Sequence, residues 1–217
     1  MATIPITTIA AQHELVENQL LDVFADRLFS QSFIGGQEVA TFEQEFAQFC
    51  GTRYAIATNS GTTALVAALA ALQLRPTDEV ITTPFSFSAT ADAIVLAGAK
   101  PVFADIDPLT GNLDPKAVEK LISSKTKAVV VVHLYGVPAN MKRLKATCKR
   151  AGVILIEDAS HAHGSEYGNQ KVGSLADIGC FSLYPAKIIG ALGNAGIVTT
   201  SNPNLAAAIR SYCHHGL

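Results

Sequence analysis

The sequence has little net charge and few cysteines. The first feature limits the classes of binding partner that are expected, and the second indicates the redox state of the compartment. Its 16 lysines and arginines against 18 aspartates and glutamates leave a formal net charge of −2. This balance gives no electrostatic footprint for nucleic acid or an anionic membrane surface, so neither is expected as a partner. The four cysteines are scattered and form no CxxC pair. They therefore indicate free thiols in a reducing compartment, which predicts a cytoplasmic protein.

The sequence also lacks a recognisable secretory leader and a suitable membrane span. Its first residues contain no basic region followed by an apolar core, so we expect no signal peptide. The apolar run from Ile178 to Thr200 is long enough to cross a bilayer, but it contains Pro185, four glycines, Asn194 and Lys187. A buried strand, a loop and a second strand fit this composition better than a transmembrane helix.

Short apolar runs alternate with helical patterns along the rest of the chain. Continuous Val and Ile runs with helices between them are typical of a parallel sheet that is buried on both faces. The pattern predicts an α/β protein with a mostly parallel central sheet flanked by helices. Helices are expected over 13–29, 37–49, 62–74, 89–97, 115–123, 140–151 and 204–217, and strands beginning at Tyr54, Glu79, Pro101, Lys127, Gly152, Ile178 and Gly196.

Lys187 is the only side chain between Ile178 and Thr200 that would be charged at neutral pH. Burial of an unpaired ammonium is costly, and such a group usually responds with a lowered pKa. A lysine with a lowered pKa is a nucleophile, which makes Lys187 a candidate for Schiff-base chemistry. The alternative is a surface lysine whose stem lies along apolar neighbours while its ammonium stays in water.

The stretch ATNSGTTAL follows a candidate strand and opens a candidate helix, with Gly61 and Thr62 at the turn. Backbone N–H groups at the start of a helix bind phosphate. An ordinary helix cap is the alternative, and the absence of a Walker lysine argues against a nucleotide P-loop. Ser182, five residues before Lys187, would give the same phosphate one more hydroxyl donor.

Two carboxylates, Glu157 and Asp158, end a very apolar candidate strand. Open parallel sheets bind ligands at this end of their strands, and an aspartate there would pair with a protonated ring nitrogen. A structural helix cap or salt bridge is the alternative. His161 and His163 follow directly, but together with Asp158 they form too thin a ligand set, so no metal site is predicted.

Phe85 and Phe87 come just after another candidate strand, among small hydroxyl residues. Both would pack in the core, or one would lie flat against a planar cofactor ring. Taken together, the lysine, the aspartate, the aromatic side chain and the helix start describe one ligand. That ligand is a planar, cationic heteroaromatic ring with a phosphate and an aldehyde, which is pyridoxal 5'-phosphate (PLP).

The ordered motifs NSGTTAL, TTPFSFSATADAIVLAGAKPVFADID, HLYGVPANM, IEDASHAHGS and GCFSLYPAKIIGALGNAGIVTT resemble the DegT/StrS family of sugar-nucleotide aminotransferases. The resemblance covers nearly the whole chain and implies a PLP-dependent transferase of fold type I. It implies transfer of an amino group from an amino acid, such as glutamate, to a keto-sugar nucleotide. It also implies a homodimer in which two subunits build each active site.

The resemblance also assigns roles to individual residues. It implies that Lys187 forms the Schiff base with the cofactor and moves the proton, and that Asp158 contacts the pyridine nitrogen. His161 would lie near the ring hydroxyl of the cofactor, and Phe87 would stack on its ring. The phosphate would be held by Gly61, Thr62 and Ser182.

The length of the chain departs from the family pattern. We expect residues 1–217 to comprise an N-terminal segment plus the PLP-binding large domain, with the smaller C-terminal domain of the family missing. This leaves an alternative function, a truncated, non-catalytic PLP-binding or regulatory protein. Another PLP-dependent activity on the same fold, sugar dehydration, is a further alternative. Dehydratases of this family carry histidine in place of the lysine, so Lys187 argues against that activity.

Overall fold

The computed structural model describes residues 8–214, which fall into two units divided between Phe42 and Glu43. The N-terminal unit contains α1 (Ala10–Glu14), α2 (Glu17–Ser30) and the first part of α3 (Gln37–Cys50). Within it, Arg27 on α2 forms an ion pair with Glu38 on α3 at 2.8 Å. α2 buries none of its residues, although several of them are large and apolar.

The helix predicted over 13–29 forms as α2, but it begins only at Glu17, and residues 13 and 14 end the separate short helix α1. The backbone leaves the helical region at Val16, with φ −130° and ψ 6°, and no side chain caps the break. Apolar residues recur at helical spacing on both sides of Val16, so the periodicity alone did not reveal the interruption.

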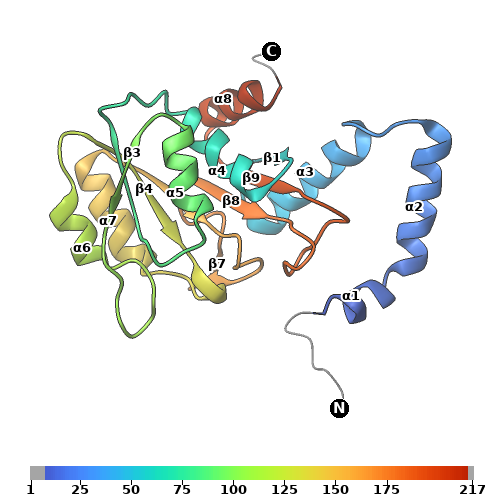
Figure 1. Ribbon diagram of the computed structural model, residues 1–217, viewed down its shortest axis with the longest axis horizontal. Coiled ribbons are helices and arrows are strands. Elements are labelled where there is room, and N and C mark those ends of the chain that lie inside the picture. Colours follow the sequence, from blue (N-terminus) through green and yellow to red (C-terminus); the bar gives the residue numbers. More distant parts are fainter. Residues whose placement is uncertain (1–7, 215–217) are drawn as a thin grey trace. The chain divides into compact units, whose positions relative to one another are not determined.

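A seven-stranded sheet forms the centre of the C-terminal unit (Figure 1). Its strand order is β1-β9-β8-β5-β4-β2-β3. The pairs β2–β3, β2–β4, β4–β5 and β5–β8 are parallel, while β9 runs antiparallel to both β8 and β1. The predicted mostly parallel sheet is therefore confirmed. Its strands are β1 (Tyr54–Thr58), β2 (Glu79–Thr82), β3 (Lys100–Phe103), β4 (Thr126–Val132), β5 (Ile154–Asp158), β8 (Ile178–Ser182) and β9 (Gly196–Thr200).

Helices cover both faces of this sheet. On one face, α4 (Gly61–Ala70), α5 (Ala89–Leu96) and α8 (Pro203–Cys213) enclose a hydrophobic core with inward-facing strand residues such as Val130, Ile156 and Val198. On the other face lie α6 (Pro115–Leu121) and α7 (Met141–Ala151). Side chains alternate along a strand, so Asp158 shares the α4 face with Ile156, whereas Glu157 points to the other.

The short elements of the C-terminal unit were not predicted. A hairpin of β6 (Glu166–Tyr167) and β7 (Gln170–Lys171) and a 3₁₀ helix, η1 (Leu134–Gly136), are too short to show a periodicity. α4 ends at Ala70, before the expected residue 74, and Gln73 adopts a left-handed backbone with φ 52°. The predicted helix over 204–217 appears as α8, and residues 215–217 lie outside the described part.

Two further features of the fold concern the cysteine thiols and the character of the helices. The four thiols are free, and burial raises the pKa of Cys50 to about 12 and that of Cys148 to about 11. Within residues 8–214, no helix combines the length and the apolar character that a membrane crossing requires.

Candidate active site

A cavity of about 430 Å³ opens where the parallel strands of the sheet end. Its wall includes Val132 at the end of β4, Asp158 at the end of β5 and Ser182 at the end of β8. The N-terminus of α4 and the loop between β8 and β9 complete it. The cavity brings together the seven side chains and backbone positions that were predicted from the sequence, namely Gly61, Thr62, Phe87, Asp158, His161, Ser182 and Lys187.

The first turn of α4 lies unusually close to the end of β8. A Cβ atom added to Gly61 would come within 2.6 Å of the Cβ of Ser182, so only glycine fits there. The Oγ of Ser60 caps the helix by accepting a hydrogen bond from the Thr63 N–H at 3.0 Å. The remaining N–H groups of the first turn have no partner within the helix. Gly61 and Thr62 line the cavity together with Ser182. This arrangement fits a phosphate group.

The carboxylate of Asp158 accepts two hydrogen bonds, one from a distant helix and one from the residue two positions after it. Its Oδ2 accepts from the Thr90 hydroxyl at 2.7 Å, and its Oδ1 accepts from the Ser160 N–H at 3.2 Å. The side chain is only 5% exposed, yet it lines the cavity. Thr90 stands in the first turn of α5, and no sequence pattern indicated it.

Glu157 takes no part in the cavity and instead joins three segments on the opposite face of the sheet. Its carboxylate accepts backbone N–H bonds at 2.9–3.0 Å from a loop, and it accepts the Nε2–H of His133 at 3.0 Å. The Nδ1 of His133 accepts the Ala139 N–H at 3.2 Å, which places the ring proton on Nε2. Both side chains are fully buried. The loop donors are Gly173, Leu175 and Ala176.

Lys187 stands on a loop that folds back on itself between β8 and β9. The Leu183 N–H bonds to the Ala195 carbonyl at 2.8 Å and closes the base of this loop. The Lys187 N–H bonds to the Tyr184 carbonyl at 2.8 Å. Burial lowers the pKa of the Lys187 ammonium, an effect that the Asp158 carboxylate partly opposes. The lysine is therefore a partly buried group of the cavity wall.

The two histidines that follow Asp158 have different surroundings. His161 lines the cavity, and its pKa is lowered by burial and by the Lys187 ammonium. His163 is buried, with its ring 5.3 Å from that of Phe181 and neither ring nitrogen in a hydrogen bond of normal geometry. Burial lowers the pKa of His163 to about 4, which the nearby Ser182 backbone partly opposes. Within residues 8–214, no three His, Cys, Asp or Glu side chains are grouped to hold a metal ion.

Of the two phenylalanines considered, only Phe87 lies at the cavity. It is 73% exposed and forms part of the wall, in a position to cover one face of a planar ligand. Phe85 is half-exposed and lies near Gly111, where a Cβ atom would come within 3.4 Å of its ring. Neither phenylalanine packs in the core. Tyr184 and Asn194, which the sequence did not indicate, also line the cavity.

The motifs and the fold place this chain among known proteins. The family model described as the DegT/DnrJ/EryC1/StrS aminotransferase family matches residues 15–217. The chain belongs to this family. The resemblance to DegT/StrS aminotransferases seen in the sequence is thereby confirmed, and so is the predicted fold class.

Relatives and a solved structure match almost the whole chain. A pleiotropic regulatory protein of Geobacillus stearothermophilus is 40% identical over 98% of this chain and 57% of its own length. A UDP-N-acetyl-3-dehydro-alpha-D-glucosamine 3-aminotransferase of Acidithiobacillus ferrooxidans is 38% identical over 98% of this chain and 58% of its own. The crystal structure of NtdA from Bacillus subtilis, with bound cofactor PMP, superposes with a TM-score of 0.92 at 34% identity, covering 100% of this chain and 49% of NtdA. This chain therefore spans about half to three fifths of the length of these relatives.

Proposed function

We propose that the chain is the cofactor-binding part of a PLP-dependent sugar aminotransferase. One observation carries the proposal: an amine with a lowered pKa, a buried carboxylate and an open helix N-terminus converge on one cavity of about 430 Å³. PLP presents a matching set of an aldehyde, a ring nitrogen and a phosphate. The residues present therefore fit this cofactor.

Each of the seven cavity residues has a place in this proposal. The N–H groups of the first turn of α4 and the Ser182 hydroxyl bind the phosphate, because both lie at the same wall. Phe87 covers one face of the ring, and His161 lies beside the ring hydroxyl. Asp158 keeps its carboxylate toward the ring nitrogen, since Thr90 fixes one of its oxygens. The phosphate donors of α4 are Gly61 and Thr62.

The chemistry follows from where this chain places its proton-binding groups. PLP, when bound, supplies an electron-withdrawing ring that stabilises negative charge on the carbon next to an amino group. The amine of Lys187 removes a proton from that carbon of the amino donor and returns one to the carbon of the amino acceptor. Its lowered pKa increases the fraction of neutral amine at any pH below the usual lysine value. Asp158 holds the proton at the ring nitrogen, because a carboxylate favours its charged form.

The substrates proposed are an amino acid, glutamate for preference, and a keto-sugar nucleotide. The name of the Acidithiobacillus relative, an aminotransferase for a UDP-linked dehydro sugar, supports the second of these. We also propose that residues 1–217 are the N-terminal segment and large domain, and that the small C-terminal domain lies outside this sequence. A homodimer is supported by exposed apolar residues of α2, including Leu21, Phe24 and Leu28. Free thiols support a cytoplasmic location.

A second candidate function is a non-catalytic PLP-binding or regulatory protein. It is favoured by the name of the Geobacillus relative, a pleiotropic regulatory protein. Both candidates require PLP in the cavity, but only the aminotransferase needs an amine placed to move protons. The position and lowered pKa of Lys187 therefore favour the aminotransferase.

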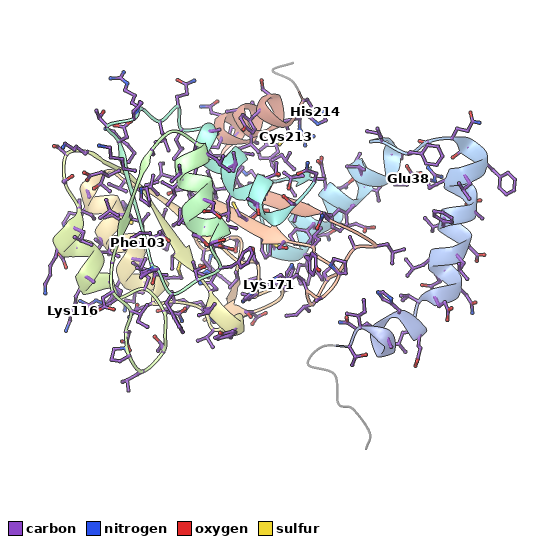
Figure 2. All side chains as sticks on the ribbon, in the orientation of Figure 1. Glu38, Phe103, Lys116, Lys171, Cys213 and His214 are labelled. Carbon is purple, nitrogen blue, oxygen red and sulfur yellow. The ribbon has the colours of Figure 1, made fainter. Side chains whose placement is uncertain are left out.

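Covalent trapping of PLP tests the proposal. The purified chain is incubated with PLP, reduced with borohydride and digested, and the modified residue is identified by mass spectrometry. We expect modification at Lys187, loss of it in Lys187→Ala, and no change in Lys116→Ala, because Lys116 is an exposed residue of α6 (Figure 2). PLP trapped on another lysine, or modification that persists in Lys187→Ala, would contradict the site.

Amino transfer separates the two candidate functions. The PLP-loaded chain is mixed with glutamate, and 2-oxoglutarate is measured over time. The aminotransferase releases one equivalent of the keto acid, whereas the regulatory protein binds PLP at Lys187 and releases none. The longer Acidithiobacillus relative is measured in parallel as a positive control.

A further inference from the structure

Tyr135 has a left-handed backbone, which is rare for a residue other than glycine. Its φ is 54° and its ψ is 24°, inside the short helix η1. Among residues 8–214, the only other non-glycine residues with positive φ are Gln31 and Gln73. A side chain in this conformation brings its Cβ too close to the backbone, so the position favours glycine. Strain of this kind persists only where the surrounding structure imposes it.

The surrounding loop, residues 133–139, is fixed at several points. The His133 N–H bonds to the Asp158 carbonyl at 3.0 Å, and the Ala139 N–H closes the loop on the His133 ring. The Ser165 hydroxyl donates to the Gly136 carbonyl at 2.8 Å. The buried hydrogen bond from His133 to Glu157 therefore anchors the loop to the strand that carries Asp158.

Burial of the Tyr135 side chain contributes little free energy to offset this backbone strain. It is 79% exposed, and within the described part of the chain its hydroxyl has no hydrogen-bond partner. Its one ring contact is with His161, at 6.1 Å between centroids and 23° between planes, which is a stacked arrangement. Tyr135 does not line the cavity, whereas His161 does. The tyrosine ring therefore lies stacked beside the imidazole, while only the imidazole lines the cavity.

We propose that Tyr135 is a positioning residue that holds the imidazole of His161 in one orientation toward the cofactor ring. The inference rests on the proposed function, in which His161 lies beside the ring hydroxyl of PLP. A stacked partner restricts rotation of the imidazole before the cofactor arrives, so less side-chain freedom is lost on binding. The anchored loop sets the position of Tyr135, and the stack transmits it to His161.

Three substitutions separate the ring from the backbone strain. Tyr135→Gly removes both the ring and the strain, Tyr135→Asn removes the ring but tolerates a left-handed backbone, and Tyr135→Phe keeps the ring. Gln73→Gly is the matched control, because it relieves the same kind of strain at an exposed position that does not line the cavity. We expect Tyr135→Gly and Gln73→Gly to melt at or above the temperature of the parent chain.

Histidine NMR of the ligand-free chain tests the stack directly. The Tyr135 ring should shift the His161 proton resonances by its ring current, and this shift should vanish in Tyr135→Gly and Tyr135→Asn but remain in Tyr135→Phe. The pKa of His161, lowered mainly by burial, should rise in the two variants that lack the ring. The Lys187 ammonium and the Asp158 carboxylate remain in place as the charges that face it. An unchanged pKa and unchanged shifts would overturn the inference.

The affinity for PLP tests whether the orientation of the His161 ring affects cofactor binding. We expect the dissociation constant of PLP, measured by absorbance, to rise about two- to tenfold in Tyr135→Gly and Tyr135→Asn, as lost aromatic stacking predicts. Tyr135→Phe and Gln73→Gly should bind like the parent chain. Equal affinity in all variants, or equal loss in Tyr135→Phe and Tyr135→Gly, would overturn the inference while leaving the proposed function intact. Failure of the parent chain to trap PLP on Lys187 would overturn the proposed function itself.

Discussion

Gly61 approaches Ser182 so closely that a Cβ on the glycine would lie 2.6 Å from the Cβ of the serine and 2.9 Å from its Cα. This contact joins the N-terminus of α4 to the carboxyl end of β8, two segments that are 121 positions apart (182 − 61). It places backbone N–H donors and a hydroxyl donor at the same wall of the cavity. A larger residue at position 61 would push the helix away from the strand and open the proposed phosphate site.

Gly61→Ala should therefore destabilise the chain and weaken PLP binding. Overpacking of this kind costs about 1–3 kcal/mol of unfolding free energy, measured by denaturant titration. Removal of the opposing side chain in Gly61→Ala/Ser182→Gly should restore part of that loss, because the closest clash is with the serine Cβ. Simple additivity of the two substitutions would show that the close approach is not what excludes alanine.

The reactivity of Lys187 should extend to lower pH than that of an exposed lysine. Burial lowers its pKa from the usual 10.5, so a larger fraction of its amine is neutral at any given pH below that value. Asp158→Asn removes the carboxylate that favours the ammonium, and the pKa of Lys187 should fall further. Reductive methylation at a series of pH values, quantified by peptide mapping, measures both effects with the Lys116 peptide as internal control. Profiles for the two lysines that coincide along the pH axis would contradict the prediction.

Thr90 should matter to the cofactor site although it does not line the cavity. Thr90→Val removes the hydroxyl that donates to Oδ2 of Asp158 and leaves a nearly buried carboxylate oxygen without that partner. Such a loss costs about 1–3 kcal/mol, and the freed carboxylate should bind PLP less tightly. Thr90→Ser keeps the hydroxyl and should stay close to the parent chain in both measurements. A Thr90→Val chain with parental stability and affinity would remove Thr90 from the site.

His163 should make the stability of the chain fall in mild acid. Its pKa is about 4 in the folded chain and 6.5 without burial, so between these values the unfolded chain binds more protons. The free energy of unfolding therefore decreases as pH falls from 6.5 to 4, by about 2 kcal/mol between pH 7 and pH 5. Denaturant titrations at both pH values measure the loss. The neutral variant His163→Leu should lack this contribution, and an identical loss in both proteins would refute the assignment.

The sequence predicted the sheet because buried parallel strands consist of continuous apolar runs that are easy to distinguish from amphipathic helices. All seven strands of the main sheet and most of its helices lie where those runs indicated. Elements that burial does not shape were missed. The break at Val16 and the hairpin of β6 and β7 depend on a few backbone angles, which leave no periodic trace.

In the candidate site, too, the sequence indicated which residues matter but not how they are placed in the folded chain. Lys187 stood out because it is a lone charge in an apolar segment, and Asp158 because it ends a buried strand. Glu157 looked equivalent to its neighbour in the sequence, yet the two carboxylates face opposite sides of the sheet. One of them lines the cavity, and the other is buried with His133.

By itself, the sequence determined which reactive side chains are present and which strands and helices carry them. It did so because hydrophobic patterning and side-chain chemistry are local properties. Only the tertiary structure decided which of these groups meet. Gly61 faces Ser182 across the cavity wall, Thr90 donates to Asp158, and Tyr135 stacks on His161. These pairs depend on strand order and on the direction in which each side chain leaves the backbone, and both are set by packing between segments distant in the chain.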